Sequence, residues 1–285
     1  MPSIYLPNRS FITISGNSAQ SFLQNIIPAK INALPFGIAR GTALLSPQGK
    51  ILFYFLISKL EEDVFVLEID SDQSDLLMKK LFLYRLRANV TFEAQKISGV
   101  TLSWNQDNFS ENPSFIDERF SIAGVSLQRT QGCSIDSTID PKEYYNLRID
   151  HGIVDPDIDY PSSSVLPYDL LMDMNKGISF TKGCYIGQEI ISRMKHRNMI
   201  RKRSIMIIGN SFLPPKGSPI LAANKTIGIL GIVVEHRALA IARIDKINES
   251  IEENVPLTAN NIKIVPSFPF WSGLKFSVVQ NPQKA

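Results

Sequence analysis

Cysteine and histidine are scarce in this chain of 285 residues. It has two cysteines, Cys133 and Cys184, and three histidines that stand far apart in the sequence. Two thiols cannot supply the four thiolates that hold an iron–sulfur cluster, and they form a structural zinc site only with help from histidine. The sequence therefore predicts no permanent metal site. In a reducing compartment, both thiols are expected to stay reduced.

Long apolar runs and a strong net charge are also missing. No apolar stretch reaches the roughly 18 to 20 residues that cross a bilayer, and the N-terminal segment lacks the basic and apolar regions of a signal peptide. We therefore expect a cytoplasmic protein without membrane contacts. The net charge of +3 permits an anionic partner but does not require one.

The order of the apolar runs predicts an α+β fold. Three of the expected strands follow one another, with the turn Ser46-Pro47-Gln48-Gly49 between the first two, and suggest an antiparallel meander. A helix is expected after Gly16, and another that starts at Ser71 and carries leucines on its apolar side. The leucines are Leu76, Leu77, Leu81 and Leu83, followed by Tyr84. The strands are expected at residues 11–14, 41–45, 51–57, 64–69, 90–92 and 100–104.

The second half of the chain changes in texture after Gly209, where short apolar runs alternate with proline and glycine. These runs are typical of a small barrel or sandwich. We place a domain boundary near Ser204, which gives domains of residues 1–203 and 204–285. The remaining expectations are a loop at 105–118, a helix at 143–150, a loop at 155–167, and strands at 227–234, 238–244, 262–265 and 276–279.

One short segment concentrates residues suited to chemistry. It is Lys182-Gly183-Cys184-Tyr185-Ile186-Gly187-Gln188-Glu189, here called the cysteine octapeptide. A helix is predicted from Gly187 onward, so Cys184 precedes a helix N-terminus and lies two residues from Lys182. Both features favour a thiolate, whereas Glu189 opposes it. A reactive thiol and an inert surface cysteine both stay open.

A basic cluster follows the octapeptide at residues 193–203. It suits a contact with phosphate, polyglutamate or RNA. Basic residues are also favourable at a helix C-terminus because of the helix dipole. We slightly favour this second interpretation.

The octapeptide, preceded by residues 177–181 and followed by a basic stretch ending at Arg203, resembles the signature of the YgfZ family and its mitochondrial relatives in iron–sulfur assembly. Most of the chain is more loosely similar to the T-protein of the glycine cleavage system, an aminomethyltransferase. The resemblance implies a T-protein-like fold, with two entwined α+β subdomains and a small C-terminal β-barrel around a central folate site. It implies tetrahydrofolate as ligand and iron–sulfur proteins or assembly factors as partners.

The same resemblance implies a role and a set of site residues. The role is support of iron–sulfur enzymes, including tRNA-modifying ones, by cluster assembly or repair. Asp150 holds the position of a pterin-binding carboxylate, which can accept two parallel hydrogen bonds; a helix-surface aspartate is the alternative. Arg9, where some members have tryptophan, could reach a folate carboxylate. The residues assigned to folate are Asp150, Tyr144, Arg148, Gly183, Tyr185 and Gln188, and those assigned to thiol chemistry are Cys184, Lys182 and Glu189.

Two other functions compete with this one. T-protein relatives place a catalytic aspartate just after the meander turn, but residues 49–55 contain no carboxylate. A folate-dependent aminomethyl transferase would therefore lack its positioned acid or base, and an enzymatic function is disfavoured. The third hypothesis is an RNA-binding module that uses the cluster at 193–203, although this cluster has no interleaved aromatic residues of the kind that stack on bases.

Overall fold

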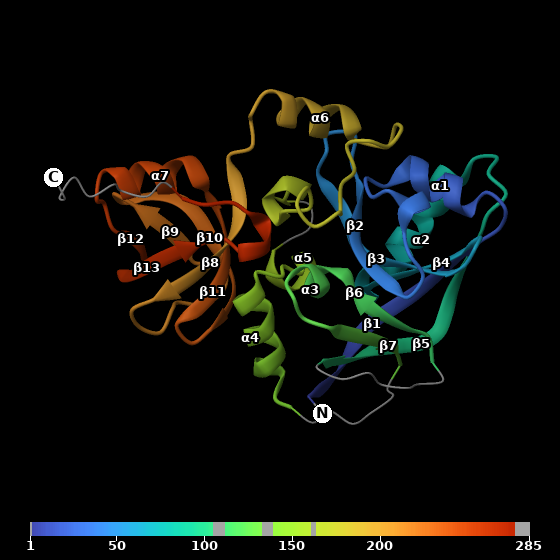
Figure 1. The fold of residues 1–285 in the computed structure, drawn as a ribbon, viewed down its shortest axis with the longest axis horizontal. Helices are drawn as coiled ribbons and strands as arrows, with labels where there is room; N and C mark the ends of the chain where they lie inside the picture. The colour runs from blue at the N-terminus through green and yellow to red at the C-terminus, as the bar shows by residue number, and fades with distance from the viewer. Residues whose placement is uncertain (1, 105–111, 133–138, 161–163, 277–285) are drawn as a thin grey trace. The chain divides into compact units, whose positions relative to one another are not determined.

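The computed structural model of the chain describes residues 2–104, 112–132, 139–160 and 164–276 (Figure 1). The chain divides into two compact units that alternate along the sequence. The first unit comprises Met1–Pro141, Ser162–Pro167 and Met172–Arg197, and the second comprises Lys142–Pro161, Tyr168–Leu171 and Asn198–Ala285. The boundary expected at 203/204 falls inside the first barrel strand of the second unit.

A closed β-barrel forms the body of the first unit, in the order β1-β4-β3-β2-β6-β7-β5. Neighbouring strands are antiparallel, except for β2 and β6, which are parallel. The N-terminal strand pairs with β4 on one side and with β5 on the other, which closes the barrel. The strands are β1 (Ser3–Ser15), β2 (Ile38–Leu45), β3 (Ile51–Glu61), β4 (Val64–Asp70), β5 (Thr91–Trp104), β6 (Ser114–Asp117) and β7 (Leu127–Gln131).

The predicted meander is confirmed by β2, β3 and β4. Thr42 lies opposite Phe55 across the first pair of strands, and Ile57 lies opposite Leu67 across the second. The run in β3 is apolar without alternation because both faces of this strand are largely covered. The β2–β3 turn therefore starts and ends on well-packed strands, which fixes its position.

Helices α1 (Ala19–Ile26) and α2 (Ser71–Arg85) contribute to the core of the first unit. Phe22 and Leu23 of α1 and Leu77 and Leu81 of α2 are buried in one cluster with the barrel strands. The expected apolar side of α2 is wrong in part, because Leu76 and Leu83 are 57% and 64% exposed. Leu77 and Leu81 are four residues apart and lie on the buried face of the helix. Leu76 and Leu83 are seven residues apart and lie on an exposed face.

Three expectations for the middle of the chain need correction. The strands expected at 90–92 and 100–104 belong to one long strand, β5, whose exposed polar centre concealed its continuity. Part of the loop expected at 105–118 lies outside the described residues, and the rest includes β6 and the start of α3 (Glu118–Ile122). Likewise, the loop expected at 155–167 contains the short helix α5 (Pro156–Asp159). In the segment 155–167, buried charged residues stand where a helix usually has apolar ones. The pattern of apolar residues therefore does not reveal α5.

The second unit contains helix α4 (Pro141–His151), which confirms the expected helix, and a second closed barrel in the order β10-β11-β8-β13-β12-β9. Most of the strand expected at 276–279 lies outside the described residues, although Phe276 stacks on Phe268 at 4.3 Å. The remaining elements are η3 (Pro167–Leu170), β8 (Lys202–Gly209), β9 (Pro219–Ala222), β10 (Lys225–Val234), β11 (Arg237–Arg243), α7 (Ile244–Glu252), β12 (Leu257–Ala259), β13 (Ile262–Ser267) and η4 (Phe270–Ser272).

Candidate functional site: an anchored cysteine loop

The cysteine octapeptide is anchored to the end of helix α1 by Lys182. The Lys182 Nζ donates to the carbonyl oxygens of Ile27 and Ala29 at 2.6 and 2.9 Å, and both of these residues are fully buried. Burial lowers the pKa of Lys182 from 10.5 to about 8. In Figure 1 the yellow segment that precedes α6 accordingly lies beside α1.

The residues just before the octapeptide add further anchors. The backbone N–H of Ser179 donates to the carbonyl of Pro28 at 2.9 Å. The Lys195 ammonium lies 3.4 Å from the ring centroid of Phe180, a cation–π contact that joins this segment to helix α6 (Gln188–His196). The loop is thus held at α1 and at α6.

The octapeptide ends in a close backbone contact with the β2–β3 turn. Gly187 precedes α6 with φ of +83°, and a Cβ placed on it would lie 2.6 Å from the carbonyl oxygen of Ser46. A larger residue would therefore collide with the turn and adopt an unfavourable backbone conformation. The helix predicted from Gly187 onward is confirmed, and its Ile191 is fully buried.

Cys184 is exposed in the middle of this anchored loop. Gly183 before it is exposed as well, and a Cβ placed on this glycine would meet no atom within 4 Å. Tyr185 after it is 7% exposed, and burial raises the pKa of this tyrosine to about 12. Ile186 packs against the core of the first unit. The loop therefore presents a thiol to solvent between two fixed flanks.

The two charged residues assigned to Cys184 have partners elsewhere. Lys182 is bound to backbone carbonyls, as described above. Glu189 is exposed and forms an ion pair with Arg193, one turn further along α6. Gln188, assigned to folate, is the first residue of the same helix, and its backbone N–H donates to the carbonyl of Tyr185 at 3.2 Å.

The folate contacts expected on α4 do not form an open set. Tyr144 is 1% exposed and Arg148 is fully buried, where it pairs with Asp159. Both side chains are thus packed inside the second unit, and their assignment to folate stays a prediction. Asp150 reaches solvent, but its carboxylate is paired with Arg237, as is the side chain of Asn146. These α4 residues belong to the second unit, whereas Gly183, Tyr185 and Gln188 belong to the first.

Arg9 also has a structural role. It is 5% exposed, and its Nε donates to Glu68 at 2.9 Å. Glu68 accepts hydrogen bonds from Arg129 as well, and Arg129 contacts Asp117 at 3.2 Å. Burial raises the pKa of Glu68, but the guanidiniums of Arg129 and Arg9 outweigh it and bring the pKa to about 2. The guanidinium of Arg9 is thus engaged by Glu68, and its contact with a folate carboxylate stays a prediction.

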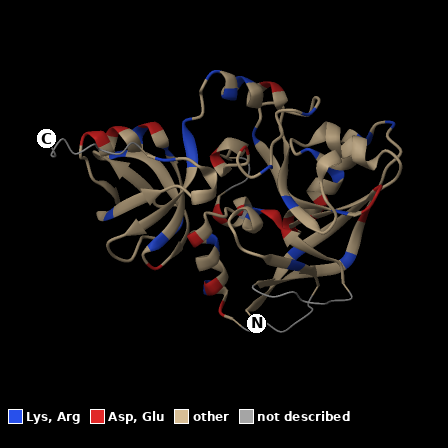
Figure 2. Cartoon of the chain, viewed as in Figure 1, with Lys and Arg blue, Asp and Glu red and all other residues tan. Residues whose placement is uncertain are grey.

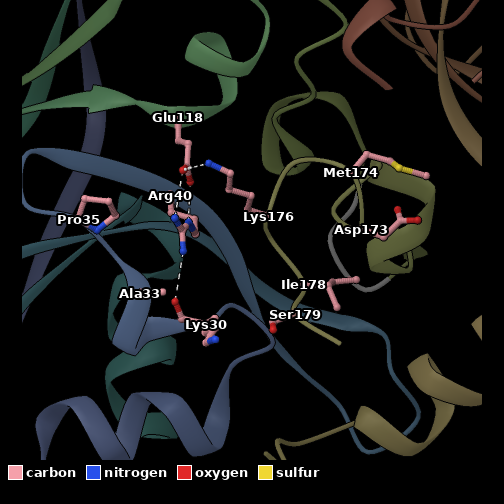
Figure 3. A pocket seen from close by; sticks show the side chains of 10 residues that line it. All are labelled: Lys30, Ala33, Pro35, Arg40, Glu118, Asp173, Met174, Lys176, Ile178 and Ser179. Atoms are coloured by element: carbon pink, nitrogen blue, oxygen red, sulfur yellow. Dashed lines mark hydrogen bonds and ion pairs between the residues drawn. The ribbon is translucent and has the colours of Figure 1, made fainter. Parts of the chain in front are cut away.

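A cleft in the first unit, with a volume of about 460 Å³, was not predicted (Figure 3). The carboxylate of Glu118 is central in it: the Arg40 Nε and Nη2 donate to it at 2.6 and 3.1 Å, and the Lys176 Nζ at 2.9 Å. Burial raises the pKa of Glu118, but these donors lower it further and give a net decrease. The cleft is also lined by Lys30, Ala33, Pro35, Asp173, Met174, Ile178 and Ser179.

Only the position of Ile178 and Ser179 next to the octapeptide could have indicated this cleft. The other lining residues come from η1 (Ile31–Ala33), β2, α3 and the segment around Lys176, which are far apart in sequence. With apolar walls and three cations against two carboxylates, the cleft can hold a small ligand that combines an apolar body with a negative charge.

The basic cluster at 193–203 is divided between separate contacts. Arg193 pairs with Glu189, and Lys195 covers Phe180. Arg203 is 5% exposed and donates to the carbonyl of Tyr168 at 3.1 Å. The part of this cluster that is free to contact a phosphate backbone is therefore smaller than the sequence suggested.

Two further kinds of feature are absent from the part of the chain that the structure describes. It contains no group of three or more His, Cys, Asp or Glu side chains placed to hold a metal ion. Among the helices in the described ranges, none has both the length and the apolarity needed to span a bilayer.

Comparison with known proteins finds similarity to proteins named as iron–sulfur cluster assembly factors. Residues 201–274 match the family model of the CAF17 C-terminal beta-barrel domain. The chain is similar to a mitochondrial iron–sulfur cluster assembly factor IBA57 homologue of Neurospora crassa, with 30% identity over 71% of this chain and 52% of that protein. It is also similar to mitochondrial IBA57 of Homo sapiens, with 25% identity over 93% of this chain and 84% of that protein.

The fungal relatives are longer than the part that matches. The chain spans between about half and three fifths of the length of three of them. All three are named as mitochondrial, as is the human protein. The cytoplasmic location expected from the sequence is therefore wrong. Composition alone did not distinguish between compartments.

The fold is similar to a crystal structure of the glycine cleavage system aminomethyltransferase T from Bartonella henselae. The TM-score is 0.68 at 12% identity, over 96% of this chain and 87% of that one. The expected T-protein-like α+β fold with a C-terminal β-barrel is thus confirmed. The relation to YgfZ is less direct, because the named relatives are IBA57 assembly factors.

Proposed function

We propose that the chain is an iron–sulfur cluster assembly factor of the IBA57 kind, in which Cys184 is the thiol that contacts the cluster or its carrier. The observation that supports this proposal most directly is the exposure of Cys184 on a loop anchored at α1, α6 and the β2–β3 turn.

A single exposed thiol has a defined use in cluster chemistry. Iron–sulfur clusters are commonly held by four cysteine thiolates, and Cys184 is the one free cysteine within the described residues. The cluster is therefore cargo, for which Cys184 supplies one ligand while a partner protein supplies others. Because Cys184 is exposed and the neighbouring Gly183 has open space where its Cβ would be, a cluster on the partner can approach this part of the loop.

The test is complementation in cells that lack the gene for this chain. Cys184→Ser should fail to restore the activity of iron–sulfur enzymes, and of tRNA-modifying enzymes that contain clusters, at normal protein levels. Cys133→Ser is the matched control for loss of a thiol, and it should restore both. Full rescue by Cys184→Ser would exclude the thiol role.

We further propose that tetrahydrofolate binds to the first unit, and the cleft around Glu118 supports this. Folate combines a flat ring system with a glutamate tail. Met174 and Ile178 offer apolar contacts for the ring, and Lys30 and Lys176 offer cations for the tail carboxylates. Bound folate would supply one-carbon chemistry or a redox-sensitive pterin. The contribution of this chain is to bind and orient it.

Anaerobic titration with tetrahydrofolate tests this second proposal. Lys30→Glu should weaken binding about tenfold or more, since it replaces an attraction for the tail by a repulsion. Lys225→Glu, which reverses an exposed charge in the second unit, is the control. Equal affinity of both variants would exclude the cleft as the folate site, whereas the role of Cys184 would be unaffected.

A further inference from the structure

A second cleft lies between the end of α2 and helix α1, and nothing described so far uses it. Its volume is about 430 Å³. Helix α1 contributes Phe22 and Ile26, and the end of α2 contributes Tyr84 and Leu86. The remaining lining residues are Ser18, Ser21, Asn25, Arg85, Arg87, Ala88 and Ile186. We call this the α1/α2 groove.

Exposed apolar side chains are concentrated at the C-terminal end of α2, next to the groove in the sequence. Leu86 is 86% exposed, Leu83 is 64% exposed and Phe82 is 49% exposed. Of these three, Leu86 lines the groove, and Leu83 and Phe82 lie three and four positions before it. A contiguous patch of exposed apolar side chains is typical of an interaction site. Leu83 is among the residues that the sequence had assigned to the buried side of α2, and the fold leaves it in solvent.

The backbone at Leu86 supports the same conclusion. Leu86 ends α2 with φ of 47° and ψ of −112°, a conformation that costs a non-glycine residue free energy. The exposed side chain gains no burial in return. Glycine would satisfy this helix end at lower cost, and the leucine side chain is available for contact with another molecule.

The charge of the groove specifies what that molecule carries. Arg85 and Arg87 are exposed at its edge, and Figure 2 shows basic residues on the turn that follows α2. Among the described residues that line the groove there is no aspartate or glutamate. The helix dipole accounts for a cation in the last turn, at Arg85, but not for Arg87 beyond the helix. The groove therefore complements a segment with apolar side chains and carboxylates.

The groove is continuous with the cysteine octapeptide. Ile186 lines it while also packing on the core, and Cys184 is only two residues away. Lys182 is bound to the end of α1, the helix that forms the opposite wall. A protein seated in the groove would thus be held beside the exposed thiol.

We propose that the α1/α2 groove is the docking site for the iron–sulfur partner protein of Cys184, which inserts an acidic, apolar segment between α1 and α2. This inference rests on the proposed function, because it takes the partner to be the protein that shares a cluster with Cys184. Leu86 and Phe22 contact the apolar side chains, and Arg85 and Arg87 contact the carboxylates. The groove binds the partner protein, and Cys184 of the octapeptide supplies a thiolate ligand to the cluster.

Site-specific photocrosslinking in cells tests the location of the partner. p-Benzoylphenylalanine replaces Leu83 in the full-length chain, and Phe212, which is 73% exposed in the second unit, is the matched control position. The expected result is a crosslink at Leu83 to an iron–sulfur protein, through a peptide that contains aspartate or glutamate, and none at Phe212. A crosslink to a second copy of this chain, to RNA or to lipid, the same product at both positions, or no product would overturn the proposal.

Charge reversal separates this proposal from the role of Cys184. Arg85→Glu/Arg87→Glu should reduce recovery of the crosslinked partner and rescue of iron–sulfur enzymes at least tenfold, while folded protein levels stay normal. Leu86→Gly should have the same effect at normal levels of folded protein, because it removes the side chain and relaxes the backbone. If both groove variants rescue fully and Cys184→Ser does not, the groove is excluded and the thiol role stands. If Cys184→Ser rescues too, the proposed function itself fails.

Discussion

The ammonium of Lys182 and the carbonyl oxygen of Ile27 lie 2.6 Å apart, although 155 positions separate them in the chain. The lysine of the octapeptide is thereby an anchor for the loop that presents Cys184. Its charge is held between buried carbonyl groups, and burial is the reason that its pKa falls to about 8.

Removal of this anchor is expected to loosen the loop. Lys182→Ala deprives the carbonyls of Ile27 and Ala29 of a shared donor, which should lower the free energy of unfolding by about 2 kcal/mol. Cleavage by protease within residues 177–187 should become faster. Urea titration and limited proteolysis measure the two effects, with the exposed Lys79→Ala as control. Unchanged proteolysis would show that the other anchors suffice.

The two glycines of the octapeptide give a matched pair of substitutions. Gly187→Ala places a Cβ 2.6 Å from the carbonyl oxygen of Ser46 at a φ of +83°, so stability should fall by about 2 to 4 kcal/mol. Gly183→Ala meets no atom within 4 Å and should change stability by less than about 0.5 kcal/mol. Thermal unfolding of both variants checks this. Equal losses would mean that the turn contact is not specific to Gly187.

The contrast between these glycines also shows how far the sequence could be interpreted. The helix start at Gly187 follows from local spacing, since Ile190 and Met194 repeat on one face. That Gly187 touches the β2–β3 turn does not follow, because Ser46 is 141 positions away and no local pattern encodes this approach. The meander and the helices α1 and α4 were predictable because local patterns encode them. The cleft around Glu118 was not, because it is formed by residues far apart in the sequence.

Buried charge is the second feature that sequence reasoning missed. Arg9, Arg148 and Glu118 had the appearance of surface or ligand-binding residues, since charged side chains are usually exposed. Each is buried with an opposite charge that comes from a distant or irregular segment. A carboxylate that is available for a ligand and one that is paired in the interior look alike until the fold supplies the partner.

The pH dependence of stability should identify Glu68. Its pKa is 4.5 in an unfolded chain and about 2 in the folded one, so the folded state binds fewer protons between these values. The stabilisation is therefore complete above pH 4.5 and is lost as the pH falls toward 2. Glu68→Gln should lower the free energy of unfolding by about 3 kcal/mol at pH 7, and the difference from the parent should shrink below pH 4.5.

Urea titrations from pH 7 to pH 2.5 measure this difference. The control is Glu62→Gln, because the side chain of Glu62 is 79% exposed, although its partner Lys59 is only 10% exposed. Its variant should differ from the parent by less than about 1 kcal/mol at every pH. A pH-independent loss in Glu68→Gln would show that packing, rather than charge, stabilises this site.

Leu86 allows a stability test that is independent of any partner. Relief of its positive-φ backbone gains about 1 to 3 kcal/mol, and the greater flexibility of glycine in the unfolded chain costs up to about 1 kcal/mol. Leu86→Gly should therefore raise the free energy of unfolding by about 1 kcal/mol. Chemical denaturation measures this, and a loss of stability would show that the leucine side chain packs within the chain.

The alternation of the two units along the sequence restricts how this protein can be divided. The segment Lys142–Pro161 of the second unit is synthesised before Met172–Arg197 of the first. A ribosome thus begins one unit before it has finished the other, and the octapeptide leaves the ribosome only after α4. No single cut between residues 142 and 197 yields two whole units. In evolution the cysteine loop is therefore inherited, lost or exchanged together with both units.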